Sequence, residues 1–233
     1  MYIRAGVAVV TGTTFESNTA FYGGATYGNG GAIAILSGSL SLMGSELLNN
    51  VSGYHGGGLH SSGSAVVTVD GTTFEGNSAM FNGGALALRG GTADLLRVEL
   101  LGNEANQGAG IYSNAVVTLV EGLVEDNTAI VGGGVYHATA EVAASMNIRD
   151  SSFLDNVGSG GTGGIHNAGC ETYLLLEDSV VFRNKSFGSI FAGGITNEGN
   201  AHGAPTMDLV RANVSLNQST ANGGGILNSD GNL

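Results

Sequence analysis

The stretch Phe74-Glu-Gly-Asn-Ser-Ala-Met-Phe-Asn-Gly-Gly-Ala-Leu86 holds two motifs that recur along the chain. The first is an apolar residue, two variable positions and Asn. It ends at Asn18, Asn50, Asn77, Asn103, Asn127, Asn156, Asn184 and Asn217. The second is a small residue, Gly and an apolar residue. Its Gly is Gly31, Gly58, Gly84, Gly110, Gly134, Gly164, Gly194 and Gly225. Eight paired copies, spaced 24 to 33 residues apart, indicate a repeat protein.

Aligning the copies on the Asn gives further apolar columns. Ten residues before it stand Ala8, Leu40, Val67, Ala93, Val117, Met146, Leu174 and Met207. Eight residues before it stand Val10, Leu42, Val69, Leu95, Leu119, Ile148, Leu176 and Leu209. After the Gly stand Ala32, Leu59, Ala85, Ile111, Val135, Ile165, Ile195 and Ile226, which we expect to be buried in every coil. The spacing of two between the first columns is that of a strand with one buried face.

Short strands in a repeat of this length predict a solenoid, because one coil cannot bury its apolar columns alone. We therefore expect an all-β fold, a right-handed parallel β-helix of about eight coils, with residues 1–233 forming a single domain. Coils would stack about 4.8 Å apart. The Asn column would form a ladder of side-chain amides. The Gly column would occupy a corner that requires positive φ or close backbone approach.

The composition restricts the possible partners. The chain is glycine-rich, with 42 Gly among 233 residues, and acidic, with a net charge of −12 that repels nucleic acid, anionic lipid and acidic polysaccharides. The only cysteine is Cys170, so no internal disulfide is expected. No apolar run approaches the roughly 18 residues of a membrane helix, so we expect no membrane insertion by this segment. The short apolar run from Val7 to Val10 fits the repeat and is not interpreted as a signal peptide.

The repeats resemble those of the chlamydial polymorphic outer membrane proteins. The best matches are Phe74-Glu-Gly-Asn77 with Gly83-Gly84-Ala85-Leu86, and Asn18 with Gly30-Gly31-Ala32-Ile33. The resemblance spans nearly the whole chain and implies a secreted or surface-displayed, adhesin-like protein. Its expected location is the cell surface or the extracellular space, and its expected partners are surface proteins or glycans of a host or neighbouring cell. Neither end of the repeat array carries a recognisable cap, so we expect a longer protein, a capping domain or end-to-end self-association.

An enzyme is the main alternative, because pectate lyases and polygalacturonases share this architecture. Such enzymes need clustered carboxylates and, for acidic sugars, basic residues. The acids Glu16, Glu75 and Glu125 share one repeat position, but intervening coils place apolar residues there. The five histidines fall in no catalytic motif, and no His or Cys pair has the spacing of metal ligands. The sequence therefore predicts no catalytic residue, no metal site and no cofactor.

Two features are candidates for recognition. Two residues after each column Gly, on the expected outer face, stand Ile33, His60, Leu86, Tyr112, Tyr136, His166, Thr196 and Leu227. From this row we select His60, Tyr112, Tyr136 and His166 as tentative binding residues, since aromatic rings in a row can contact sugars or a protein. The second feature is extra loop length near 138–144, 168–172, 185–192 and 198–206.

Two function classes therefore stay open, a surface scaffold that binds and a β-helix polysaccharide enzyme. Carboxylates clustered in a groove beside the late loops would favour the enzyme, and coupled aromatic side chains would favour binding.

Overall fold

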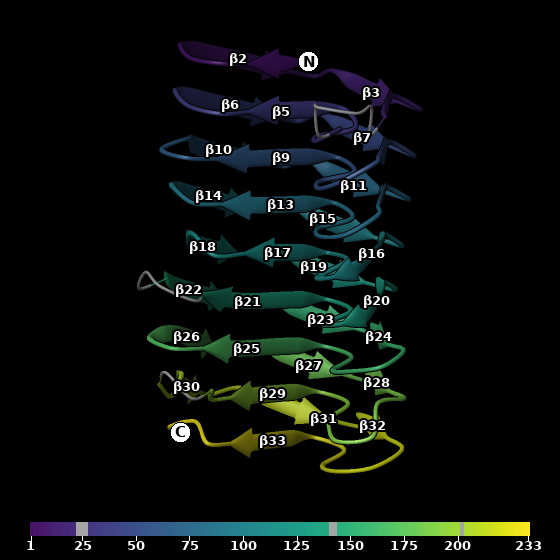
Figure 1. Cartoon of the computed structure of the whole chain (residues 1–233), viewed down its shortest axis with the longest axis vertical. Coiled ribbons are helices and arrows are strands. Elements are labelled where there is room, and N and C mark those ends of the chain that lie inside the picture. The colour runs from purple at the N-terminus through teal and green to yellow at the C-terminus, as the bar shows by residue number, and fades with distance from the viewer. Residues whose placement is uncertain (22–27, 140–143, 201–202) are drawn as a thin grey trace.

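The computed structural model describes residues 1–21, 28–139, 144–200 and 203–233. They form an all-β parallel β-helix, in which each coil lies on the next from the N-terminus to the C-terminus (Figure 1). Every ladder is parallel, and strands from successive coils are neighbours in four sheets. The described residues contain no helix, and so none that could span a membrane.

We name the four sheets A to D. Sheet A contains β1 (Tyr2–Ile3), β5 (Ile33–Ile35), β9 (Leu59–Ser62), β13 (Leu86–Arg89), β17 (Ile111–Ser113), β21 (Val135–Thr139), β25 (Ile165–Gly169), β29 (Ile195–Glu198) and β33 (Ile226–Ser229). Sheet B contains β2 (Val7–Thr11), β6 (Ser39–Met43), β10 (Val66–Asp70), β14 (Thr92–Leu96), β18 (Val116–Val120), β22 (Ala144–Arg149), β26 (Thr172–Glu177) and β30 (Thr206–Val210).

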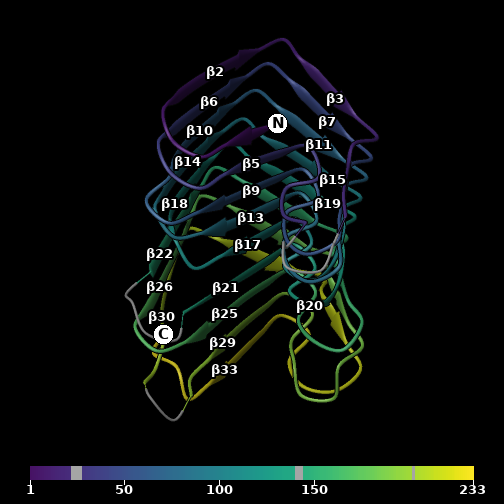
Figure 2. The same cartoon turned by 45° about the horizontal axis from the view of Figure 1, so that its top comes forward.

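Sheets C and D carry shorter strands. Sheet C contains β3 (Thr14–Glu16), β7 (Glu46–Leu48), β11 (Thr73–Glu75), β15 (Glu99–Leu101), β19 (Leu123–Glu125), β23 (Ser152–Leu154), β27 (Val180–Phe182) and β31 (Asn213–Ser215). Sheet D contains β4 (Thr19–Ala20), β8 (Val51–Ser52), β12 (Ser78–Ala79), β16 (Glu104–Gln107), β20 (Thr128–Val131), β24 (Val157–Gly158), β28 (Lys185–Ser186) and β32 (Gln218–Ser219). Sheets B and C meet like the sides of a roof, and sheet A crosses beneath them (Figure 2).

The core is built from apolar columns that run through the coils. On sheet B, the two columns expected from the sequence pair residue by residue, for example Leu40 with Val67 and Leu42 with Val69. Sheet C adds the apolar residue of the Asn motif, with Phe74 paired to Leu100 and fully buried. Both columns join one continuous cluster with the inward side chains of sheet A.

The Asn motif, which recurs once in each coil, forms a ladder of side-chain amides at the corner between sheets C and D. From Asn18 to Asn184, each Nδ2 group donates a hydrogen bond to Oδ1 of the Asn in the next coil, at distances of 2.9 to 3.1 Å. The backbone N–H of each of these seven Asn residues donates to the same oxygen, for example from Asn103 to Asn127 at 2.9 Å. The residue before the Asn is left-handed, with φ near +54° at Asp155 and Leu216.

The glycine column serves close approach rather than positive φ. A Cβ on Gly164 would lie 2.4 Å from the carbonyl oxygen of Gly194, which leaves no room for a side chain. Positive φ occurs earlier in this corner, at residues such as Gly83 (φ +66°) and Gly132 (φ +66°). The sequence allowed either positive φ or close backbone approach as the reason for glycine, and the structure supports close backbone approach at the column positions.

The register of sheet A corrects the sequence alignment in two coils. Leu59 pairs with Ile33 and Leu86, not with Ala32 and Ala85. The motif there reads Gly-Gly-Ala before the large apolar residue, so alignment on the glycine places these coils one residue too early. Ile33 and Leu86, expected on the outer face, therefore lie in the core.

Burial of the column after the glycine was expected in every coil, and the last coil departs from this. Ile165 and Ile195 are fully buried, whereas Ile226 is half-buried. Ile226 lies on β33, which pairs with β29 on one side only. A residue stacked on one side loses part of the cover that a neighbouring coil provides.

Candidate functional site, a groove over sheet A

The outer face of sheet A is the floor of a groove. Loops that enter and leave the sheet descend past it on either side, so that the face lies between two rows of loops (Figure 2). Two adjoining hollows occupy this space, with volumes of about 530 and 480 Å³. Arg89 and Asn114 line both hollows. We call the two together the sheet A groove.

The outward column of sheet A runs along the groove. Backbone pairing orders it as Ala34, His60, Ala87, Tyr112, Tyr136, His166, Thr196 and Leu227. All four tentative binding residues therefore share one column. Their exposure differs, however. Tyr112 and Tyr136 line the larger hollow, His60 lines the smaller one and is 4% exposed, and His166 is 2% exposed.

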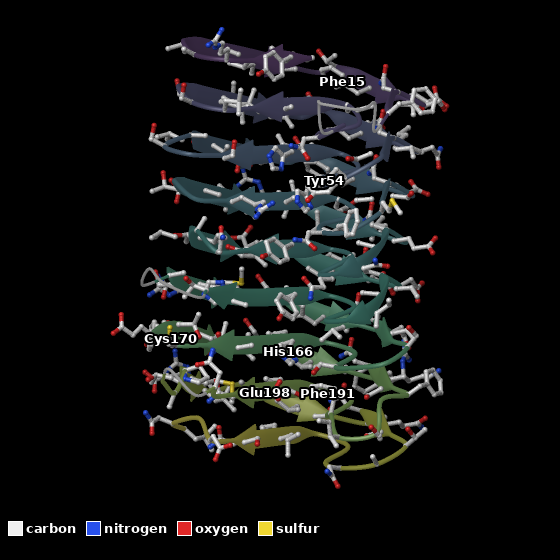
Figure 3. All side chains as sticks on the ribbon, viewed as in Figure 1. Phe15, Tyr54, His166, Cys170, Phe191 and Glu198 are labelled. Atoms are coloured by element: carbon white, nitrogen blue, oxygen red, sulfur yellow. The ribbon has the colours of Figure 1, made fainter. Side chains whose placement is uncertain are left out.

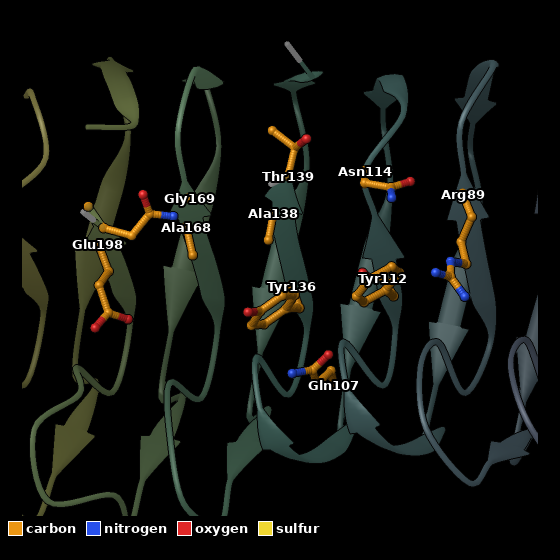
Figure 4. A pocket seen from close by; sticks show the side chains of 12 residues that line it. Arg89, Gln107, Tyr112, Asn114, Tyr136, Ala138, Thr139, Ala168, Gly169 and Glu198 are labelled. Atoms are coloured by element: carbon orange, nitrogen blue, oxygen red, sulfur yellow. The ribbon is translucent and has the colours of Figure 1, made fainter. Parts of the chain in front are cut away.

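The two tyrosines and His166 form a parallel stack. The ring centroids of Tyr112 and Tyr136 are 5.8 Å apart with an angle of 5° between the planes, and those of Tyr136 and His166 are 5.0 Å apart at 2°. The rings of each pair are nearly parallel, and their centroids lie farther apart than the roughly 3.5 Å between touching ring faces. Tyr112 and Tyr136 are both partly exposed and line the larger hollow, where Figure 4 shows their rings.

His166 is held by polar groups on both sides. Its Nδ1 is 2.9 Å from the Thr162 hydroxyl, which shares a 2.7 Å hydrogen bond with the hydroxyl of Thr196. Its Nε2 is 3.4 Å from a carboxylate oxygen of Glu198. The hydrogen bond from His166 lowers the pKa of Glu198. Figure 3 shows His166, Glu198 and Phe191 close together, and the His166 and Phe191 centroids are 5.6 Å apart. These contacts orient His166, which in turn supports the Tyr136 ring.

The smaller hollow contains a cluster of basic side chains. Arg89 Nη1 is 2.5 Å from His55 Nε2, and the rings of His55 and His60 stack with centroids 5.9 Å apart. Burial, together with the charge of Arg89, lowers the pKa of His55 to about 3 and that of His60 to about 4. Both histidines are therefore neutral at physiological pH, and Arg89 supplies the positive charge.

The larger hollow is uncharged over its middle. Burial, followed by the neighbouring Tyr112 and Glu198, raises the pKa of Tyr136 to about 12, and burial also raises the pKa of Tyr112. Both phenols therefore keep their protons at physiological pH and can donate as well as accept hydrogen bonds.

Glu198 is the one carboxylate among the described residues that line either hollow. On sheet C, Glu75 and Glu125 are separated by a coil that carries Leu101, as the sequence indicated, and they lie on a different wall. Within the described part of the chain, no three His, Cys, Asp or Glu side chains gather as metal ligands do. The groove therefore offers aromatic rings, hydroxyls and amides, with Arg89 where the two hollows meet and Glu198 toward the other end of the larger hollow.

No family model, no curated protein and no solved structure matches this chain. The resemblance noted in the repeats therefore stays an expectation, and the site must be interpreted from its own geometry.

Among the lining residues that were not selected from the sequence are His55 and Arg89. They lie at corners or strand ends, where the repeat motif does not constrain the residue. The late loop near 198–206 does contribute, since Glu198, Gly199 and Asn200 line the larger hollow. Parts of the expected loops, at 140–143 and 201–202, lie outside the described residues, as does His202.

Proposed function

We propose that this chain is the non-catalytic β-helix scaffold of a secreted or cell-surface, adhesin-like protein, and that its sheet A groove binds an extended glycan. The observation that carries the proposal is the parallel stack of Tyr112, Tyr136 and His166, in which the two tyrosines line the floor of the groove. The carbon–hydrogen face of a pyranose ring is apolar and packs on an aromatic face, while its hydroxyls need hydrogen-bond partners at the rim.

The rim supplies those partners. Gln107, Asn114 and Thr139 line the larger hollow around the tyrosines, and the tyrosine hydroxyls are protonated. The groove follows the coil stack, so its length suits a chain of sugars better than a single small molecule. An open, elongated floor with polar edges is the form expected for an oligosaccharide site.

The composition of the groove favours binding over hydrolysis. Glycoside hydrolases use two carboxyl groups about 5 to 9.5 Å apart, and Glu198 stands without a second acid among the described residues that line the groove. Its close partner is the buried His166, which also supports the tyrosine stack. Clustered carboxylates would favour an enzyme and coupled aromatic side chains would favour binding, and the described residues of the groove supply coupled aromatic side chains.

A glycan array followed by calorimetry tests this proposal. Wild-type protein should bind a set of oligosaccharides, and Tyr136→Ala should weaken that binding on the order of tenfold, because it removes a central aromatic contact. Tyr173→Ala is the matched control, since Tyr173 lies on sheet B and bonds to Asp208 away from the groove.

Two results would overturn the proposal. Binding that survives both Tyr112→Ala and Tyr136→Ala would place the ligand elsewhere. Cleavage of a bound oligosaccharide that Glu198→Gln abolishes would make the protein an enzyme.

A further inference from the structure

Arg89 differs from the arginines on the walls of the β-helix. Of the other five arginines, Arg97, Arg149, Arg183 and Arg211 pair with carboxylates on neighbouring coils, and Arg4 is exposed near the N-terminus. Arg89 makes no ion pair with a carboxylate of the described residues, and its guanidinium instead contacts the His55 ring inside the groove. Arg89 is thus a cation that lines a hollow without a carboxylate partner among the described residues.

The contact between Arg89 and His55 determines where the proton of His55 lies. A guanidinium only donates hydrogen bonds, so His55 Nε2 must accept and the neutral ring carries its proton on Nδ1. That Nδ1–H group is buried and has no hydrogen-bond partner in the protein. His55 therefore holds an unused donor on the side of its ring that faces away from the Arg89 contact.

Unsatisfied polar atoms gather around this point. Among the described residues, four buried atoms that belong to the lining of the smaller hollow have no partner in the protein. They are Asn29 Oδ1, His55 Nδ1, His60 Nδ1 and Asn114 Oδ1. Buried polar groups in proteins are normally hydrogen-bonded, so a cluster of exceptions beside one cavity calls for polar partners from outside the chain.

The charge of Arg89 acts locally. Glu198, the acid of the groove, lies four coils away along sheet A, which is about 19 Å at the usual strand spacing. At physiological ionic strength charges are screened over about 8 Å, so Glu198 does not cancel the field of Arg89. The same screening limits the effect of the carboxylates on the other walls.

We propose that the hollow around Arg89, His55 and His60 binds the carboxylate of a single acidic sugar within the glycan that occupies the groove. This rests on the proposed function and names the ligand class more closely. The planar Arg89 fork matches a carboxylate, and the unpartnered Oδ1 of Asn114, on the coil next to Arg89, suits a hydroxyl of the same sugar ring. Neutral sugars would follow over Tyr112 and Tyr136 toward Glu198. A polyanion with a carboxylate on every ring would place one against Glu198, so the ligand carries its acid at the Arg89 end.

The first experiment tests the subsite without the rest of the groove. Sodium glucuronate is titrated into the protein while the ring resonances of His55 and His60 are followed by NMR, with glucose as the neutral probe. We expect saturable shifts with glucuronate only. Arg89→Gln should remove them, and Arg97→Gln should keep them, because Arg97 is an exposed arginine directly after β14. Arg89→Lys is the second variant if Arg89→Gln does not fold, and it should weaken the response because the two-pronged contact is lost.

The second experiment uses calorimetry with a tetrasaccharide that ends in one glucuronate and with its neutral glucose counterpart. The acidic probe should bind about tenfold to a hundredfold more tightly, and Arg89→Gln should abolish this preference while keeping the affinity for the neutral probe. Equal affinities in the wild type, or a preference that survives in Arg89→Gln, would overturn the carboxylate subsite.

The two experiments separate the possible failures. Histidine shifts with glucuronate but no binding of either tetrasaccharide would keep the subsite and overturn the glycan-binding function. Binding of both tetrasaccharides without a response to glucuronate would keep the glycan-binding function and overturn the carboxylate subsite. A response to inorganic sulfate but not to glucuronate would show a tetrahedral-anion site, which contradicts the proposal.

Discussion

His137 and Asn167 occupy equivalent positions in neighbouring coils, paired on β21 and β25, and both are fully buried. From Asn167 onward this position forms a second amide ladder. Asn167 Nδ2 donates to Asn197 Oδ1 at 2.8 Å, and Asn197 Nδ2 donates to Asn228 Oδ1 at 2.9 Å. His137 interrupts it, because neither ring nitrogen nor Asn167 Oδ1 has a hydrogen-bond partner of good geometry.

The substitution His137→Asn should extend this ladder by one coil. The new amide would donate to the unsatisfied Asn167 Oδ1, so we expect the free energy of unfolding to rise by about 1 kcal/mol. Urea denaturation at pH 7 measures it. His137→Ala is the control, since it removes the ring without supplying a donor and should destabilise the protein through a cavity. Equal stability of the two variants would contradict the ladder interpretation.

Stability should fall on mild acidification. Burial lowers the pKa of His137 to about 4 from its ordinary 6.5, so the unfolded chain takes up a proton before the folded chain does. The stability is therefore complete above pH 6.5 and is lost as the pH falls toward 4. His137 alone should account for about 2 kcal/mol between pH 7 and pH 5, and His55 and His60 act in the same direction. Urea midpoints of wild type and His137→Asn at both pH values provide the test, and identical pH dependence would refute it.

Substitution in the main Asn ladder should lower the stability most in the central coils. Asn103→Ala removes the bonds to Asn77 and Asn127 and the bond that Asn103 Nδ2 donates to the buried Phe74 carbonyl. The free energy of unfolding should fall by about 3 to 5 kcal/mol. Asn18→Ala is the matched control at an exposed rung, whose side chain bonds to Asn50 alone among the described residues. Chemical denaturation of both variants is the measurement. Similar losses at the two rungs would show that the ladder does not depend on burial.

The inward register of sheet A is tested by Ile165→Asp. This residue is fully buried between Val135 and Ile195, so an unpaired carboxylate there should destabilise the chain by several kcal/mol. Val116→Asp is the control, because Val116 is exposed on sheet B beside Thr92 and Ser145. Thermal melting distinguishes them. A parental melting temperature for Ile165→Asp would mean that the register is wrong.

The sheet B columns could be predicted because their distance from the Asn is constant in every coil. A constant distance makes alignment on the Asn equivalent to structural register, as the pairing of Leu42 with Val69 confirms. The corner before sheet A varies by one residue, which is why the glycine alignment placed Ile33 and Leu86 outward. Alignment on the large apolar residue after the glycines would have given the correct register.

The aromatic row of the site was visible in the sequence, but its surroundings were not. Tyr112 and Tyr136 repeat at a fixed offset, so their shared face follows from the period of the strand. Their depth in a groove depends on the course of the loops beside them, which no repeat position specifies. Arg89 and His55 meet although 34 residues separate them, at positions outside every motif.

The length of the groove changes in steps of one coil, because each coil adds about 4.8 Å along the stack. The acid-binding hollow at Arg89 and the carboxylate of Glu198 belong to different coils, and only whole repeats lie between them. Gain or loss of a repeat in the gene would move these two groups apart or together by one such step while leaving the chemistry of each end intact. On the proposed function, the number of coils between the two groups would set the length of glycan that spans them, and recombination could change this length without a single point mutation.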